Sequence, residues 1–233
     1  MTPAEANGNE TLQLPPRAPP RIERLSDLIF GLALSLGAFA LVASPPGNAT
    51  ALYTDLATFG FSFLILIAVW LTYTRLITGL TLERHTAVRM NIVLLFFVSI
   101  EPFLLNALVR PGDSGAFFAA VSQAYGVDVG AMVTLLGLFA WALATSRDPS
   151  MSVSVRGSLR REALRRWFAA GMFFVSAVPF FETPELLGEP VRLWIWGVAL
   201  GVVWGTHAGR TPSRSGNESG SGNTVSTGIA PGK

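Results

Sequence analysis

The residues best suited to chemistry stand together at the start of one apolar segment. Arg24, Ser26 and Asp27 precede a run of mostly Leu, Ala, Gly and Phe at 28–43, in which Ser35 carries the single hydroxyl group. Ionisable groups beside hydrocarbon are costly and are often functional. Ser26 and Asp27 are also residue types that cap helices, because their side chains accept hydrogen bonds from free backbone N–H groups. We therefore expect a polar cluster at the start of a membrane helix.

Groups that could perform catalysis or hold a metal ion are scarce elsewhere. The chain has no cysteine, which excludes disulfides, thiolate nucleophiles and cysteine-based metal sites. Its two histidines, His85 and His207, are far apart in the chain, and neither belongs to a metal-ligand or catalytic cluster. We predict that the protein is not an enzyme, has no cofactor and binds no nucleic acid.

The composition is that of a membrane protein. Half of the 233 residues are hydrophobic, the mean hydropathy is +0.46, and only 14% are charged. Soluble domains carry about 25% charged residues. The apolar residues form long blocks, each near the ~20 residues that cross ~30 Å of hydrocarbon as a helix. Continuous blocks also exclude a barrel, whose strands alternate apolar and polar residues. The predicted fold class is therefore all-α and polytopic.

Six apolar blocks predict six transmembrane helices in one domain at 21–208. Breaks rich in proline and glycine separate the blocks, for example at 44–48 and 110–113. The apolar stretch at 115–125 is too short to cross alone, so it is either an interfacial helix or an extension of the fourth span. The predicted spans are 26–43, 52–78, 88–109, 127–146, 162–181 and 190–208.

Basic residues gather in the segments that would share one side of the membrane. These segments are the tails at 1–20 and 209–233, both predicted to be disordered, and the connections after the second and fourth spans. Fifteen of the 17 Lys and Arg residues lie in these segments or beside them, and the exceptions are Arg110 and Arg192. Cytoplasmic segments carry such an excess of Lys and Arg, so both termini are predicted to be cytoplasmic.

Charges at the two membrane surfaces suggest contacts with ions and lipids. Asp55 and Glu101 lie near the predicted outer face, where an acidic vestibule would concentrate cations. Alternatively, acids remain there only because topology excludes basic residues. The connection between the fourth and fifth spans is a candidate site for anionic lipid, although topology alone also demands basic residues there. Its arginines are Arg156, Arg160, Arg161, Arg165 and Arg166.

The first span has two kinds of helical face. Leu32, Leu36 and Phe39 follow the spacing of one face and form a bulky apolar stripe, beside a stripe of small residues that includes Ser35. Small residues let membrane helices approach closely. Around a symmetry axis, bulky apolar side chains would form a constriction that gates by losing water. Ordinary packing or lipid contact is the alternative interpretation of this pattern.

Three segments carry a family resemblance. Residues 24–35 read Arg-Leu-Ser-Asp followed by alternating apolar and small residues, and Trp70 is followed by Tyr73 and Arg75. Residues 91–103 begin with asparagine and end in Glu-Pro-Phe. In this order they resemble the transmembrane protein 175 family, which includes the endolysosomal potassium channel and its prokaryotic relatives. Tyr73 departs from the family pattern, which generally has histidine there.

The resemblance implies a potassium-permeable cation channel in the plasma membrane of a prokaryote, with K⁺ as the permeant ion. It implies a homotetramer in which the first helix of each subunit lines a central pore. Leu32, Leu36 and Phe39 would form the constriction, and the Ser35 hydroxyl would tune ion preference. The residues that would anchor the pore helix are Arg24, Ser26, Asp27, Trp70 and Tyr73.

Two other functions remain open at this stage. Pro102 and Pro179 within apolar segments, with Glu101 beside the first, are also compatible with the broken-helix ion site of a secondary transporter. The chain is also compatible with a membrane scaffold that conducts no ion. Passive flux of K⁺ through the purified protein separates the channel from both alternatives.

Overall fold

The computed structural model describes residues 21–43, 47–78, 85–109, 115–146, 151–181, 185–186 and 189–204. Six α-helices account for most of these residues, which confirms the all-α fold class. A short 3₁₀ helix (Pro179–Phe181) and a two-stranded ladder of β1 (Glu185–Leu186) and β2 (Glu189–Pro190) precede the last helix. The helices are α1 (Arg21–Ala43), α2 (Ala49–Ile77), α3 (His85–Val109), α4 (Gly115–Ala144), α5 (Val153–Ser176) and α6 (Val191–Trp204).

Each predicted span overlaps one of these helices. Within the described part of the chain, α2, the segment Thr86–Leu108 of α3, and α4 are long and apolar enough to cross a membrane. The stretch at 115–125 extends α4, which settles the alternative left open by the sequence. The six-span count and the cytoplasmic termini stay predictions, and the tails at 1–20 and 209–233 lie outside the described residues.

Two helix starts follow directly from capping residues. The Asn48 side chain accepts a hydrogen bond of 2.8 Å from the Ala51 N–H, and α2 begins at the next residue. The Ser152 hydroxyl accepts in the same way from Val155 at the start of α5. These caps satisfy N–H groups that the first helical turn leaves without a partner. They explain why both helices begin before the apolar runs that marked the spans.

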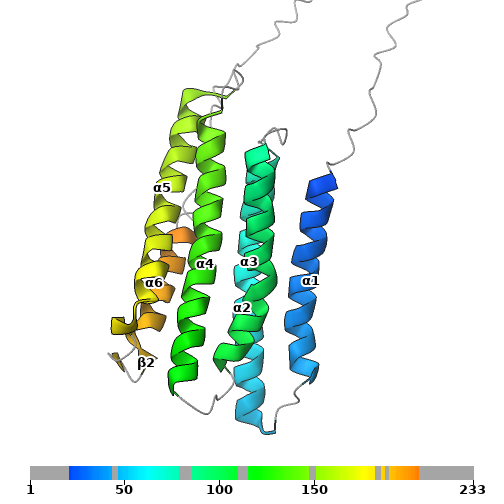
Figure 1. Cartoon of the computed structure of the whole chain (residues 1–233), viewed down its shortest axis with the longest axis vertical. Helices are drawn as coiled ribbons and strands as arrows, with labels where there is room; N and C mark the ends of the chain where they lie inside the picture. Colours follow the sequence, from blue (N-terminus) through cyan, green and yellow to red (C-terminus); the bar gives the residue numbers. More distant parts are fainter. Residues whose placement is uncertain are drawn as a thin grey trace, which may run out of the picture.

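Successive helices run in opposite directions through an elongated bundle (Figure 1). The start of α1, the end of α2, the end of α4 and the start of α5 therefore lie at the same end. Figure 1 also shows α1 at one edge, where it packs against α2 and α3, while α4, α5 and α6 form the opposite side. Arg24, Arg75 and the arginines of α5 consequently gather at one end of the bundle.

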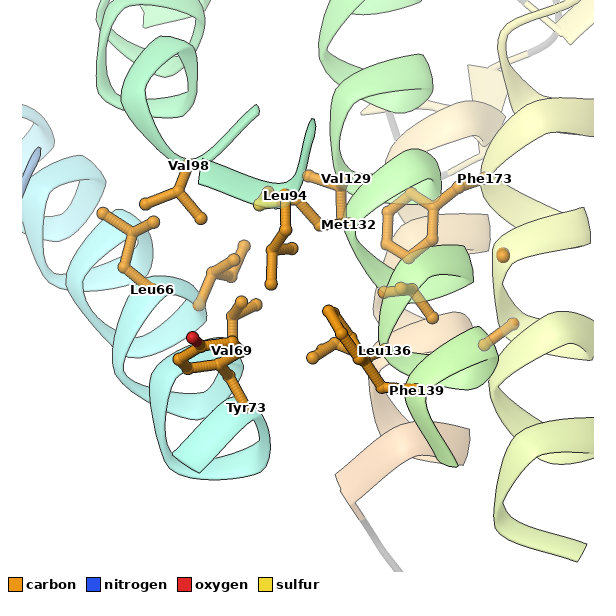
Figure 2. Packing of buried hydrophobic residues seen from close by; sticks show 14 of the residues in the cluster. Leu66, Val69, Tyr73, Leu94, Val98, Val129, Met132, Leu136, Phe139 and Phe173 are labelled. Carbon is orange, nitrogen blue, oxygen red and sulfur yellow. The ribbon is translucent and has the colours of Figure 1, made fainter. Parts of the chain in front are cut away.

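The core lies among α2, α3, α4 and α5. Figure 2 shows side chains from these helices converging at the centre of the bundle. Lipid tails are as apolar as these side chains, so close van der Waals packing holds membrane helices together instead of escape from water. The labelled core residues are Leu66, Val69, Tyr73, Leu94, Val98, Val129, Met132, Leu136, Phe139 and Phe173.

Glycine allows α4 and α5 to approach closely. A Cβ atom on Gly137 would lie 2.5 Å from Trp167 Nε1, and one on Gly130 would lie 3.1 Å from Phe174 Cε1. Trp167 Nε1 donates a hydrogen bond of 3.4 Å to the Thr134 carbonyl, which holds the indole across the gap. The contact between α4 and α5 therefore depends on the missing side chain at 137.

We expect Gly137→Ala to destabilise the fold. The new methyl group must displace the Trp167 ring, and overpacking of this kind costs about 1–3 kcal/mol. Gly171→Ala in α5 is the matched control, because nothing lies within 4 Å of its added Cβ atom. Thermal unfolding of both variants in detergent checks the prediction. Equal midpoints for the two variants would contradict this account of α4–α5 packing.

Candidate functional site

One face of α1 is committed to the bundle. Ser26, Phe30 and Ala33 are buried on this face, at the spacing of one helical stripe. Further along, the position that a Cβ atom on Gly37 would occupy lies 3.5 Å from the Phe59 ring of α2. These residues fix which way α1 is rotated about its own axis.

A different, exposed face of α1 carries the predicted constriction residues. Leu32, Leu36 and Phe39 are 57%, 50% and 66% exposed in the single chain. Leu25 and Leu28 extend the same exposed apolar stripe toward the start of the helix. A stripe of this kind must be covered by lipid or by another subunit. The structure therefore brings the three predicted residues onto one outward face.

Ser35 lies within this exposed face and bonds to its own helix. Its hydroxyl donates a hydrogen bond of 2.8 Å to the Gly31 carbonyl one turn earlier. A hydroxyl has one proton to donate and two lone pairs to offer as acceptors. Because the proton is directed back into the helix, the oxygen lone pairs remain available on the exposed side. This is the orientation that suits a cation.

Hydrogen bonds join the start of α1 to both neighbouring helices. The Ser26 and Tyr73 hydroxyl groups are 2.9 Å apart, and Asn91 Nδ2 donates to Ser26 Oγ at 3.1 Å. Trp70 Nε1 donates to Asp27 Oδ1 at 3.0 Å. Four of the five predicted anchoring residues thus meet, two from α1 and two from α2. The fifth, Arg24, is exposed and takes no part in these bonds.

Asn91 of α3 is a member of this network that received no role from the sequence. It is buried and joins Ser26 to α3. The sequence signal for this role is a lone asparagine at the start of an apolar span, because a buried amide needs a polar partner.

Tyr73 is also held by aromatic packing. The ring centroids of Phe30 and Phe139 lie 6.0 and 6.1 Å from that of Tyr73.

Glu101 does not line an outer vestibule, so this part of the predicted acidic site is wrong. Its side chain is 0% exposed, and Glu101 Oε2 accepts a hydrogen bond of 2.7 Å from Ser62 of α2. Asp128 of α4 is buried near it and interacts with it electrostatically. Sequence position placed Glu101 near a helix end but did not show that its face turns toward α2 and α4. Asp55 is half-buried, and its place in a vestibule stays a prediction.

The structure also corrects the expected surface position of Arg166. It is 4% exposed, and its guanidinium pairs with Glu162 one turn earlier at 2.5 Å, so it does not belong to an open lipid-binding surface. Arg160 and Arg161 are exposed, and Arg160 lies over the Trp141 ring at 5.8 Å. The other predicted lipid contacts, at Arg156 and Arg165, are half-buried. Contact between the protein surface and anionic lipid stays a prediction for these four arginines.

A buried arginine joins the last three helices. Arg192 of α6 donates from Nε to the Ser176 carbonyl at 2.7 Å and contacts the Ser122 hydroxyl of α4. Trp196 Nε1 donates to Ser176 Oγ at 2.7 Å. In the sequence, Arg192 stands out only as an exception to the distribution of basic residues. In the structure it stabilises the packing of α6 on α4 and α5.

We expect Tyr73→Phe to weaken the attachment of α1. The variant keeps the aromatic packing but removes the hydroxyl that bonds to Ser26, which costs about 1 kcal/mol. Tyr53→Phe is the matched control, because Tyr53 is an exposed tyrosine on the same helix. Thermal unfolding in detergent checks the difference. An equal midpoint for both variants would show that the Ser26–Tyr73 bond contributes nothing measurable.

The first three helices are similar in sequence to those of a known family. Residues 21–102 match the family model described as endosomal/lysosomal potassium channel TMEM175. The matched range covers α1, α2 and α3 as far as Pro102, and so includes all three predicted motifs except the final residue of the third. No curated protein sequence matches the chain.

The fold is also found in a solved structure. It is the crystal structure of a variant of the potassium channel MtTMEM175 in complex with a nanobody–MBP fusion protein. The similarity has a TM-score of 0.61 at 14% sequence identity, and covers 86% of this chain and 97% of the other. The predicted resemblance is therefore confirmed: residues 21–102 carry the sequence pattern of the TMEM175 family, and the chain shares the fold of a TMEM175 structure.

Proposed function

We propose that this chain is a subunit of a potassium-permeable cation channel whose pore is lined by α1. The observation that carries the proposal is the division of α1 into two faces. One face bonds to α2 and α3 through Ser26 and Asp27, and the other exposes Leu32, Leu36 and Phe39. The family description matched by these residues is that of a potassium channel, which supports the same function.

The proposed assembly is a homotetramer with four copies of α1 around the pore axis. The exposed stripe of each copy then faces the pore axis, where the stripes of the other copies cover it. A helix rises 1.5 Å per residue, so rings of Leu32 and Leu36 would lie about 6 Å apart, and rings of Leu36 and Phe39 about 4.5 Å apart. Three apolar rings at this spacing form a continuous constriction that closes by losing water.

Such a constriction distinguishes ions mainly by the cost of stripping water. Apolar side chains offer no oxygen to replace the hydration shell, and K⁺ gives up water more readily than Na⁺. The preference for K⁺ is therefore expected to be modest. Ser35 adds one acceptor oxygen per subunit beside these rings, so its lone pairs would favour cations.

The surrounding residues receive roles consistent with a membrane channel. The Ser26, Asp27, Trp70 and Tyr73 contacts would hold the cytoplasmic end of α1, with exposed Arg24 at the membrane surface. All six helices would span the plasma membrane of a prokaryote with both termini in the cytoplasm. Asp55 would lie near the outer mouth. Anionic lipid headgroups would contact the arginines at the cytoplasmic end, namely Arg156, Arg160, Arg161 and Arg165.

We expect Leu36→Ala to alter cation flux. The smaller side chain widens the central ring and keeps water in it, so flux should rise and the preference for K⁺ over Na⁺ should fall. Leu64→Ala is the matched control, because Leu64 is 58% exposed on α2 and lies outside the proposed pore. Flux of each ion into liposomes containing the purified protein checks the prediction. No passive flux through folded wild-type protein would contradict the channel and favour a transporter or scaffold.

The absence of cysteine from the sequence permits a direct test of which residues face the pore. We expect a cationic thiol reagent to reduce K⁺ flux through Leu36→Cys, because the attached charge blocks an apolar ring. Leu64→Cys serves as the control and should conduct as before. Equal sensitivity of the two variants would contradict lining by α1. Native mass spectrometry of the same preparations tests the tetramer.

A further inference from the structure

A basic cavity lies at the arginine-rich end of the bundle, away from the exposed face of α1. It has a volume of about 520 Å³ and is bounded by the ends of α2 and α4 and the first half of α5. Its charged wall consists of Arg75, Arg161, Arg165 and Arg166, with Glu162 as the only acid among the lining residues. Glu162 already pairs with Arg166. Three positive charges in the wall are therefore left without a carboxylate among those lining residues.

Two arginines of the wall have unused hydrogen-bond donors. Arg165 Nε and Arg166 Nη1 are buried and have no hydrogen-bond partner among the described residues. Arg75 and Arg165 also repel the Arg166 guanidinium electrostatically. Burial of charged donors without acceptors is costly, and concentrating like charges adds to that cost. An anion in the cavity would relieve both penalties at once.

The donor arrangement indicates the class of anion. Guanidinium groups bind phosphate oxygens in pairs of parallel hydrogen bonds, and several arginines suit an anion with several oxygens. The hydroxyl groups of Thr72 and Ser158 lie in the same wall, and Leu76, Leu143 and Leu159 give it an apolar part. The volume exceeds that of a single phosphate and falls within the range of sites for small organic ligands.

We propose that this cavity binds a phosphate-bearing anion, held by Arg75, Arg165 and Arg166. The phosphate belongs either to the headgroup of an anionic lipid or to a soluble phosphorylated molecule. Arg75 lies on α2 two residues after Tyr73, so the ligand would join α5 to the helix that anchors α1. An effect of the ligand on conduction rests on the proposed channel function, whereas binding itself does not.

Binding to the purified full-length protein tests the proposal without any measurement of flux. Inorganic pyrophosphate, added at constant ionic strength with chloride, should raise the midpoint of thermal unfolding. Retention of phosphatidylglycerol, detected by native mass spectrometry after extraction from mixed vesicles, tests the lipid source. Arg75→Gln and Arg165→Gln should each weaken binding on the order of tenfold, as expected for loss of a charged hydrogen bond.

Arg89→Gln is the matched control. Arg89 is an exposed arginine of α3 that lies outside the cavity wall, so its loss should leave binding unchanged. Binding of pyrophosphate alone would identify a soluble ligand, and retention of phosphatidylglycerol alone a lipid headgroup. Binding of neither probe would overturn the proposal. So would equal weakening in Arg75→Gln and Arg89→Gln, since that outcome indicates a general effect of surface charge.

Discussion

The attachment of α1 by hydrogen bonds near its start is the constraint on which the proposed site depends. In hydrocarbon, apolar side chains gain nothing by leaving lipid for another helix, so polar contacts and close packing must fix the position of an edge helix. The bonds from Ser26 to Tyr73 and Asn91, and from Trp70 to Asp27, supply such contacts. They also fix the rotation of α1, because Ser26, Phe30 and Ala33 must all face the bundle. The outward direction of Leu36 is a consequence.

The two sides of the bundle are held together in different ways. On one side, α4 and α5 touch along glycines, and Gly137 leaves no room for even a methyl group beside Trp167. On the other side, α2 and α3 are the only described helices with which α1 has substantial contacts. The polar bonds of α1 are concentrated near one of its ends. A helix held at one end can tilt at the other with little loss of packing. That difference suits a fixed scaffold beside a movable helix, as the proposed pore would need.

The sequence of this chain predicts local features of its helices, but it does not predict which helices are neighbours. The contacts of Ser26 and Asp27 could be anticipated because a polar pair at the foot of an apolar helix needs partners, and the family resemblance indicated Trp70 and Tyr73. The extent of α4 could not be anticipated, since an apolar stretch at 115–125 is equally suited to a helix at the membrane interface or to a longer span. Periodicity states which residues share a face but not which helix covers it. For that reason the sequence did not predict the burial of Glu101 and Arg166, which were both expected at surfaces.

The burial of Glu101 changes how cation preference must arise in the proposed channel. With that carboxylate bonded to Ser62 inside the bundle, the described face of α1 from Leu32 to Phe39 carries no acid. Attraction for cations must then come from dipoles and from the mouth of the pore. The Ser35 oxygen supplies one dipole per subunit, and the carboxyl end of α1, at Ala43, carries the partial negative charge of the helix. Both act at short range, so a pore of this kind favours cations over anions more firmly than it separates K⁺ from Na⁺.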